Sequence, residues 1–156
     1  MNTNILSAEF LPPTLNDIIG AARTGKYVSS SLKKKWHKKL SPLVKLLPNM
    51  KGEVYLECVW FVKNRNRDQD NITAAQKYIL DSLVEQKRIK DDNLSVIQSP
   101  VFHHFIISDF DGFSIYIRDK EAFKKRLGED LSSPPSGSIS LVRHRTSSPK
   151  RILRKK

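Results

Sequence analysis

Asp68 and Asp70, two aspartates separated by one residue, are the residues whose type and spacing first suggest chemistry. Carboxylate oxygens are hard ligands, so clustered aspartates suit Mg²⁺ or Mn²⁺ rather than zinc. In extended backbone, side chains at i and i+2 point the same way, which would let this pair share one cation. Asp91 and Asp92 follow one helix length later and could complete the coordination shell. A cation held there would activate water and neutralise charge developing on a phosphoryl group.

A lysine accompanies these carboxylates. At about 100° per residue, Lys77 and Asp81 lie within about 20° of Asp70 on a helical wheel, opposite the apolar face. Lys77 could therefore contact the reacting phosphate. The alternative is an i,i+4 ion pair between Lys77 and Asp81, worth about 0.3–0.5 kcal/mol. An Asp-rich turn can equally be no more than a helix cap.

The elements that must position these residues follow from hydrophobic periodicity. Strict alternation over residues 54–62 predicts a strand with one wholly apolar face. A basic loop at 63–67 then leads to the aspartate pair. Apolar residues at helical spacing predict a helix over 72–83, with Asp or Asn available as its cap. A polar turn at 91–93 follows that helix.

The flanking segments complete the expected domain. Prolines make residues 10–16 extended or turn-like. Helical spacing over 32–47, with serines before it, predicts a helix that is kinked or split at Pro42. An apolar stretch at 94–107 and a strand at 113–118 predict a β-hairpin, followed by a short helix over 119–127. Pro100 favours an edge strand or a bulge in the first of these strands.

The charge distribution points to a polyanionic partner. The 156 residues hold 28 Lys and Arg against 16 Asp and Glu, a net charge of +12. Residues 1–128 suffice for one domain, whereas the Ser/Pro-rich and then basic segment 129–156 is expected to be a disordered tail. DNA-backbone contact is expected of the basic residues Lys33, Lys34, Lys35, Lys38, Lys63, Arg65 and Arg67. The alternative for the lysine cluster is a solvated helix face.

Several other features of the sequence do not indicate a functional site. No apolar run is long enough for a membrane helix, and nothing near the start resembles a secretory signal. The single cysteine, Cys58, excludes an intramolecular disulfide and favours a reducing, cytoplasmic compartment. It is expected in the core, as are Trp36 and Trp60. Adjacent histidines at 103–104 would point to opposite faces of a strand and so could not readily chelate one ion.

The chemical motifs occur in a recognisable order. They are Arg67-Asp68-Gln69-Asp70-Asn71, then Lys77, then Leu80-Asp81-Ser82-Leu83, then Asp91-Asp92-Asn93. This order resembles the signature of the RusA family of Holliday-junction resolvases, which has a D-x-D-N motif, a lysine and D-[AGS]-L on a helix, and a D-D turn. Residues 11–16 resemble the family's opening P-P-[ST]-x-N, and the resemblance covers about residues 8–118.

The resemblance implies an α+β fold, with a small mixed sheet and a β-hairpin packed against two or three helices, in a homodimer. It implies a Mg²⁺-dependent enzyme of recombination and repair that nicks paired strands of a four-way junction, in a bacterial, phage or plasmid context. Asp68 and Asp70 match the family's paired metal ligands, and Asp92 its third, with Asp91 as the alternative. The family's lysine falls at Ala74, so Lys77 is the expected substitute.

Two other functions remain open from the sequence. The first is a basic nucleic-acid-binding module without catalysis, in which the aspartates are structural. The second is an RNA- or ribosome-associated protein, suggested by the basic tail. Mg²⁺-dependent nicking of a four-way junction distinguishes the enzyme from the binding module. Competition between RNA duplex and branched DNA tests the RNA-associated protein.

Overall fold

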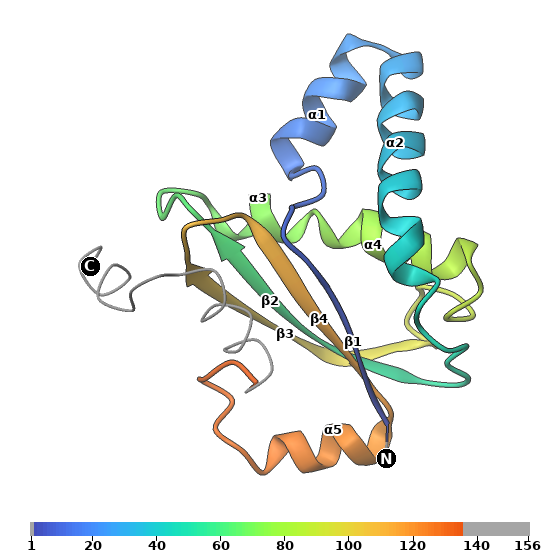
Figure 1. The fold of residues 1–156 in the computed structure, drawn as a ribbon, viewed down its shortest axis with the longest axis vertical. Coiled ribbons are helices and arrows are strands. Elements are labelled where there is room, and N and C mark those ends of the chain that lie inside the picture. Colours follow the sequence, from blue (N-terminus) through green and yellow to red (C-terminus); the bar gives the residue numbers. More distant parts are fainter. Residues whose placement is uncertain (1, 136–156) are drawn as a thin grey trace.

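The computed structural model describes residues 2–135 and shows an α+β fold built on one mixed sheet (Figure 1). The sheet has four strands in the order β1-β4-β2-β3. The elements in chain order are β1 (Thr3–Ala8), α1 (Leu15–Thr24), α2 (Lys26–Val44), β2 (Val54–Val62), α3 (Gln69–Thr73), α4 (Gln76–Glu85), β3 (Ile97–Ile107), β4 (Gly112–Arg118) and α5 (Lys120–Leu127). No helix in this part of the chain is long and apolar enough to cross a membrane.

Strand β2 lies at the centre of the fold, with the bounds that the sequence predicts. One face of the sheet carries its largest buried residue, Trp60, which packs with Leu40 of α2 and Ile79 of α4 in the main core. The other face is also buried, because Val59 and Phe61 form a second, smaller cluster. The strand therefore has two buried faces rather than one apolar face and one solvated face, as a central strand covered on both sides should.

The predicted β-hairpin is wrong. Strand β3 pairs with β2 in parallel, and β4 pairs with β2 antiparallel on the opposite edge, so β2 lies between the two strands. The segment 108–111 crosses the end of β2 instead of joining neighbouring strands. Turn residues show that a chain reverses direction, but they do not show whether a third strand is inserted between the two.

The first strand closes the other side of the sheet. β1 pairs antiparallel with β4, and Thr3 lies opposite Arg118. The backbone N–H of Asn2 also donates to Asp119 Oδ2 at 2.7 Å. Strand β3 forms the opposite edge, and its register with β2 shifts between Tyr55 and Glu57. Pro100 lies in that part of β3, so the expectation of an edge strand or bulge at this residue is confirmed.

Helix α1 was not expected from the sequence, and α2 begins earlier than predicted. Thr14 lies before α1 in extended backbone, and its backbone N–H donates to Asp17 Oδ2 at 3.0 Å, as in a capping box. Gly25, with φ of 153°, separates the two helices, so the serines at 29–31 lie inside α2. Pro42 lies in the last turn of α2, where the helix continues to Val44 without a break.

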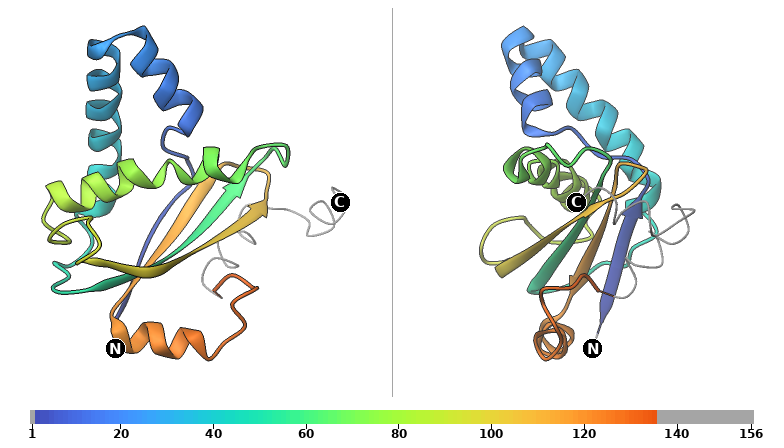
Figure 2. Two further views of the ribbon diagram at one scale, coloured as in Figure 1. Left: turned by 180° about the vertical axis from the view of Figure 1, so that it is seen from behind. Right: turned by 90° about the vertical axis from the view of Figure 1, so that its left-hand side faces the viewer.

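Figures 1 and 2 show that α1 and α2 form a helical hairpin that projects from one end of the molecule, whereas α5 lies at the other end. The base of this hairpin packs on α3 and α4, which lie across one face of the sheet. The helix predicted over 72–83 is divided into α3 and α4. They meet at Ala74 and Ala75, where the backbone tightens and Ala75 N–H donates to Ile72 C=O at 3.1 Å.

A buried ionic cluster joins the second face of the sheet to α5. Glu57 of β2 accepts hydrogen bonds from Arg118 Nη1 at 2.6 Å and from Arg126 Nε and Nη2, both at 2.8 Å. His104 Nε2 lies 2.6 Å from the same carboxylate. Burial alone would raise the pKa of Glu57, but hydrogen bonds from Arg126, His104 and Arg118 outweigh it and lower the pKa from 4.5 to about 2. The carboxylate is therefore held ionised.

Residues 129–135, which the sequence analysis assigns to the tail, contribute to this cluster. Arg126 Nη2 donates to the carbonyl oxygen of Ser133 at 2.6 Å, and Arg126 Nη1 donates to Glu129 Oε1 at 3.2 Å and to the carbonyl of Asp130 at 3.3 Å. The described body therefore continues through Pro135. The rest of the expected tail, 136–156, lies outside the described residues.

We expect a chain ending at Gly128 to be less stable than a chain ending at Pro135 by about 1–3 kcal/mol. The shorter chain lacks Glu129 and Asp130, which accept from Arg126 Nη1, and Ser133, which accepts from Nη2; Glu57 still accepts from Nε and Nη2. A buried donor without its partner, here Nη1, costs that amount. Urea denaturation of the two truncated proteins measures the difference in the free energy of unfolding. Equal stabilities would contradict a structural role for residues 129–135.

Candidate metal centre and nucleic-acid interface

Asp68 and Asp70 lie at the start of α3, where β2 and its basic loop lead into the helix. Asp68 precedes the helix with φ of −76° and ψ of 144°, and its carbonyl accepts the N–H of Ile72 at 3.3 Å. Asp70 lies in the first turn, and its Oδ1 accepts the N–H of Asn71 at 3.0 Å. Both side chains are exposed, and neither forms an ion pair with another described residue. The pair presents two carboxylates to solvent.

The backbone at this pair differs from the expected one. Asp68 is extended, but Asp70 is already helical, so the two side chains are not related as i and i+2 of a strand. The helix begins three residues earlier than predicted. Asp68 is its N-cap without a side-chain cap hydrogen bond, and the Asp70 carboxylate in the first turn interacts favourably with the helix dipole. The two carboxylates are still attached two residues apart, at the start of the same helix.

Asp91 and Asp92 lie beyond the far end of α4 (Figure 1). Helices α3 and α4 cover residues 69–85, roughly 25 Å at 1.5 Å per residue. Asp91 serves the turn, because its Oδ1 accepts the N–H of Asp92 at 2.7 Å and its Oδ2 accepts the Asn93 side chain at 3.0 Å. Within residues 2–135, no three His, Cys, Asp or Glu side chains gather closely enough to hold a metal ion. One chain therefore does not bring Asp92 to the aspartate pair.

Lys77 lies on the exposed side of α4. Its Nζ is 3.8 Å from Asp81 Oδ1, and its side chain is 69% exposed, against 23% for Asp81. The structure thus contains the loose i,i+4 ion pair that the sequence analysis gives as the alternative. Such an exposed pair holds the lysine weakly, which leaves its ammonium group able to reach a ligand.

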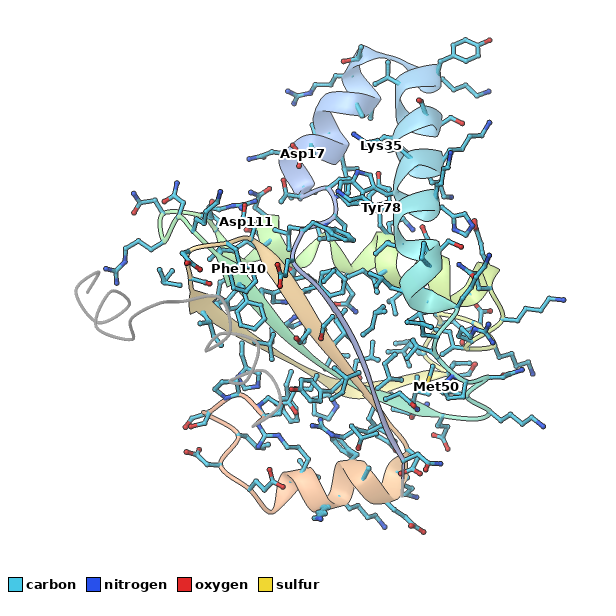
Figure 3. The ribbon with its side chains drawn as sticks, viewed as in Figure 1. Asp17, Lys35, Met50, Tyr78, Phe110 and Asp111 are labelled. Carbon is cyan, nitrogen blue, oxygen red and sulfur yellow. The ribbon has the colours of Figure 1, made fainter. Side chains whose placement is uncertain are left out.

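The basic loop 63–67 is tied to the connection between β3 and β4. Lys63 N–H donates to Asp111 Oδ1 at 3.0 Å, and Arg67 Nη1 lies 3.7 Å from Asp111 Oδ2. Figure 3 shows Asp111 in this connection, next to the labelled Phe110. Lys63 and Arg65 are exposed and Arg67 is partly buried, so the loop presents positive charge directly before the aspartate pair.

The α1–α2 hairpin adjoins the same pair. The N–H of Asn16, in the first turn of α1, donates to Asn71 Oδ1 at 2.9 Å, and Asn71 directly follows Asp70. On the neighbouring α4, burial raises the pKa of Tyr78, and the carboxylates of Asp81 and Asp17 raise it further. Figure 3 shows Tyr78 near the base of the hairpin. Helix α1 therefore leads from the aspartate pair toward the tip of the hairpin.

This hairpin carries the excess of positive charge. Its residues 15–44 hold seven basic side chains and one acidic side chain, whereas the rest of residues 2–135 holds fourteen basic and fifteen acidic. The four lysines named as DNA contacts on this helix are all exposed, namely Lys33, Lys34, Lys35 and Lys38. Lys39 differs, because its Nζ lies 4.3 Å from the centre of the Phe10 ring and packs beside Trp36.

The residues expected to be structural are largely so. His103 Nδ1 accepts the indole N–H of Trp60 at 3.0 Å, whereas His104 lies against Glu57 on the other face. The two histidines thus point to opposite faces, as predicted. Cys58 is fully buried, and burial raises the pKa of its thiol. Trp36 is only partly buried, at the foot of the hairpin.

Sequence reasoning missed the Glu57 cluster and helix α1. A charged residue such as Glu57 in the middle of a strand indicates a buried ion pair only when its partners are known. Its partners Arg118 and Arg126 lie more than 60 residues away in the sequence. Helix α1 could have been found from the pair Thr14 and Asp17, which fits a capping box.

No family model matches the chain, and no curated protein matches it in sequence.

Proposed function

We propose that the chain is a Mg²⁺-dependent, structure-selective endodeoxyribonuclease of the RusA type, which resolves Holliday junctions or other branched DNA by paired nicks. One observation carries the proposal: two exposed carboxylates, with no cationic partner among residues 2–135, lie between a basic loop and the foot of a basic helical hairpin. Acidic ligands flanked by phosphate-binding cations are what metal-assisted cleavage of a polyanion requires. The ordered motifs of the RusA resemblance add support.

The residues present fit Mg²⁺, with Mn²⁺ as the alternative. Mg²⁺ keeps several waters and binds proteins through one or two carboxylates together with substrate phosphates. Asp68 and Asp70 would supply those carboxylates, and the bound ion would activate water and neutralise phosphoryl charge. The chain's own task is to orient the two carboxylates. The Asn71 N–H holds Asp70 Oδ1, and the bond from Ile72 N–H to the Asp68 carbonyl fixes the backbone that carries the Asp68 side chain.

Asp92 enters this proposal only through a homodimer. Because α3 and α4 separate Asp92 from the aspartate pair, it would have to join the site of the partner subunit. A two-fold axis makes such an exchange reciprocal, since each copy gives to the other what it receives. Two sites related by that axis would also suit symmetrical nicks in a four-way junction.

The remaining residues hold the DNA. Lys63, Arg65 and Arg67 precede the aspartate pair, and the lysines of α2 extend the positive surface along the hairpin. Their contacts with phosphates would supply most of the affinity, and the geometry of the branch would supply the selectivity. Lys77 would contact the reacting phosphate after leaving its loose pair with Asp81.

The test is nicking of a synthetic four-way junction by the full chain, with Mg²⁺ or with EDTA. We expect paired nicks that need the metal and the branch, and far less cutting of linear duplex of the same sequence. Binding without any metal-dependent nicking would contradict the enzyme and favour the second candidate.

Lys77→Ala should slow the chemical step by about 100-fold, the effect of removing one group that stabilises transition-state charge. Single-turnover nicking measures this step, and junction affinity in EDTA should change much less. Lys90→Ala, at another exposed lysine, is the matched control. A change confined to thermal stability would show that Lys77 serves only its pair with Asp81.

The second candidate is a nucleic-acid-binding protein without catalysis. It is favoured by the structural partners of two of the proposed site residues, because Asp70 Oδ1 accepts the Asn71 N–H and Lys77 pairs with Asp81. In this case Asp68 and Asp70 serve only the start of α3, and the basic surfaces bind branched DNA or RNA.

A further inference from the structure

The tip of the α1–α2 hairpin has its own arrangement of polar and aromatic groups. Lys26, Ser29, Ser30 and Lys33 of α2 line a depression against Ala22 of α1, with a volume of about 460 Å³. These four residues of α2 fall on one stripe of the helix, within about 100° of one another. The depression has two ammonium groups and two hydroxyls, and no acidic side chain lines it. That composition matches a phosphate diester.

An aromatic side chain lies beside this depression. Tyr27 is 89% exposed, more than any other large hydrophobic side chain in the described residues. Lys34 and Lys38 follow it by seven and eleven residues, so all three lie on one stripe, adjacent to the stripe of the depression. A tyrosine this exposed at the end of a projection, with lysines below it, has no packing role among the residues that the structure describes.

We propose that the hairpin tip binds branched DNA at its branch point, with a backbone phosphate in the Lys26–Lys33 depression and the Tyr27 ring stacked on an unpaired base. This inference rests on the proposed function, because it takes branched DNA as the substrate. Aromatic stacking recognises bases of any sequence, and lysine contacts recognise the backbone, so the tip selects for exposed bases rather than for a sequence. At a branch point the stack of base pairs is interrupted, so a base there is unpaired and stacked on an aromatic ring at a lower cost than a base within linear duplex.

The geometry links this tip to the aspartate pair. Helix α1 begins at the Asn16–Asn71 hydrogen bond, next to Asp70, and its ten residues span roughly 15 Å to the tip. At 3.4 Å per base pair, that length corresponds to about four base pairs of a DNA arm lying along the helix. The hairpin would thus fix the distance between the branch point and the strand presented to Asp68 and Asp70.

The experiment measures binding of the full chain to a four-way junction with 2-aminopurine at the branch point, in EDTA so that no strand is cut. Tyr27→Ala should weaken junction binding by about 5- to 150-fold, the range for loss of one base stack, and should abolish the fluorescence change. Binding to linear duplex should stay as in the wild type. Tyr27→Phe keeps the ring and should retain both signals.

The phosphate contact has a separate readout. Replacing Lys26 and Lys33 together by alanine should flatten the slope of log K against log salt by about 0.9, the contribution of the one phosphate that the depression holds. Lys124 and Lys125 of α5, exposed at the other end of the molecule, are the control pair, and their removal should leave the slope unchanged (Figure 1).

The outcomes separate this inference from the proposed function. If the wild type nicks junctions and Tyr27→Ala binds them as well as the wild type does, the role of the tip is wrong and the nuclease stands. If the tip variants lose junction binding while the wild type never nicks, the tip stands and the nuclease falls. A wild type that binds junction no better than linear duplex overturns the tip as a branch-point contact.

Discussion

Asp70→Asn is expected to lower the rate of Mg²⁺-dependent junction nicking by about three orders of magnitude, while junction binding stays equal or becomes tighter. The substitution removes a negative ligand, and a bound cation supplies several kcal/mol of stabilisation to phosphoryl transfer. Asparagine keeps the oxygen that accepts the Asn71 N–H, so the start of α3 is preserved. Binding gains from the loss of a carboxylate that repels phosphate. Single-turnover nicking and affinity in EDTA measure the two effects.

The same variant tests where Asp92 acts. Asp92→Asn should also remove nicking if its carboxylate completes the site of the partner subunit. Mixing Asp70→Asn and Asp92→Asn subunits would then restore one intact site per mixed dimer, and nicking of single strands should return. If each variant is inactive alone and the mixture is inactive as well, Asp92 does not complete the site of the partner subunit. Unchanged nicking by Asp70→Asn would end the assignment of the aspartate pair.

Glu57→Gln is expected to lower the free energy of unfolding by about 3–5 kcal/mol, the cost of leaving a buried charge without its partner. The variant leaves Arg118 and Arg126 buried without their carboxylate. Total stabilities of about 5–15 kcal/mol make this a large fraction. Glu53→Gln, at an exposed residue just before β2, is the matched control, and urea denaturation measures both variants. A loss no greater than that of the control would contradict the role of the cluster.

The cluster also predicts a pH dependence. The pKa of Glu57 is lowered from 4.5 to about 2 in the folded protein. A carboxyl with a depressed folded pKa contributes stability that is complete above its unfolded pKa and is lost as pH falls through its folded value. The wild type should therefore lose this contribution between about pH 4.5 and 2, and Glu57→Gln should show a smaller loss over the same interval.

Local sequence patterns predicted the helices and strands better than they predicted which of them contact one another. The alternation over 54–62 gave β2 its bounds, because period-two hydrophobicity is a property of the strand itself. The same pattern could not show that β2 separates β3 from β4, since strand order depends on contacts between distant residues. Likewise, Arg118 and Arg126 gave no sign in the sequence that they share Glu57.

The candidate site was predicted by residue type more than by geometry. The sequence placed Asp68 and Asp70 at a junction between strand and helix, where the structure also has them. It also expected the chain to return Asp92 to that pair, but α3 and α4 run without a fold-back, so the helix separates them. Spacing along a chain indicates which residues share a helix face, and it does not indicate how far a later turn lies from the start of that helix.

The pairing of β1 with β4 sets the order in which the protein can acquire its sheet during synthesis. When Ala8, the last residue of the first strand, is added to the chain, residue 118, opposite Thr3, is still about 110 residues from being added. At about 5–20 residues per second, β1 has no strand to pair with for roughly 5–20 s. The helices α1 and α2, which contact each other within one hairpin, can form in that interval. We therefore expect the basic projection to form before the sheet that supports it.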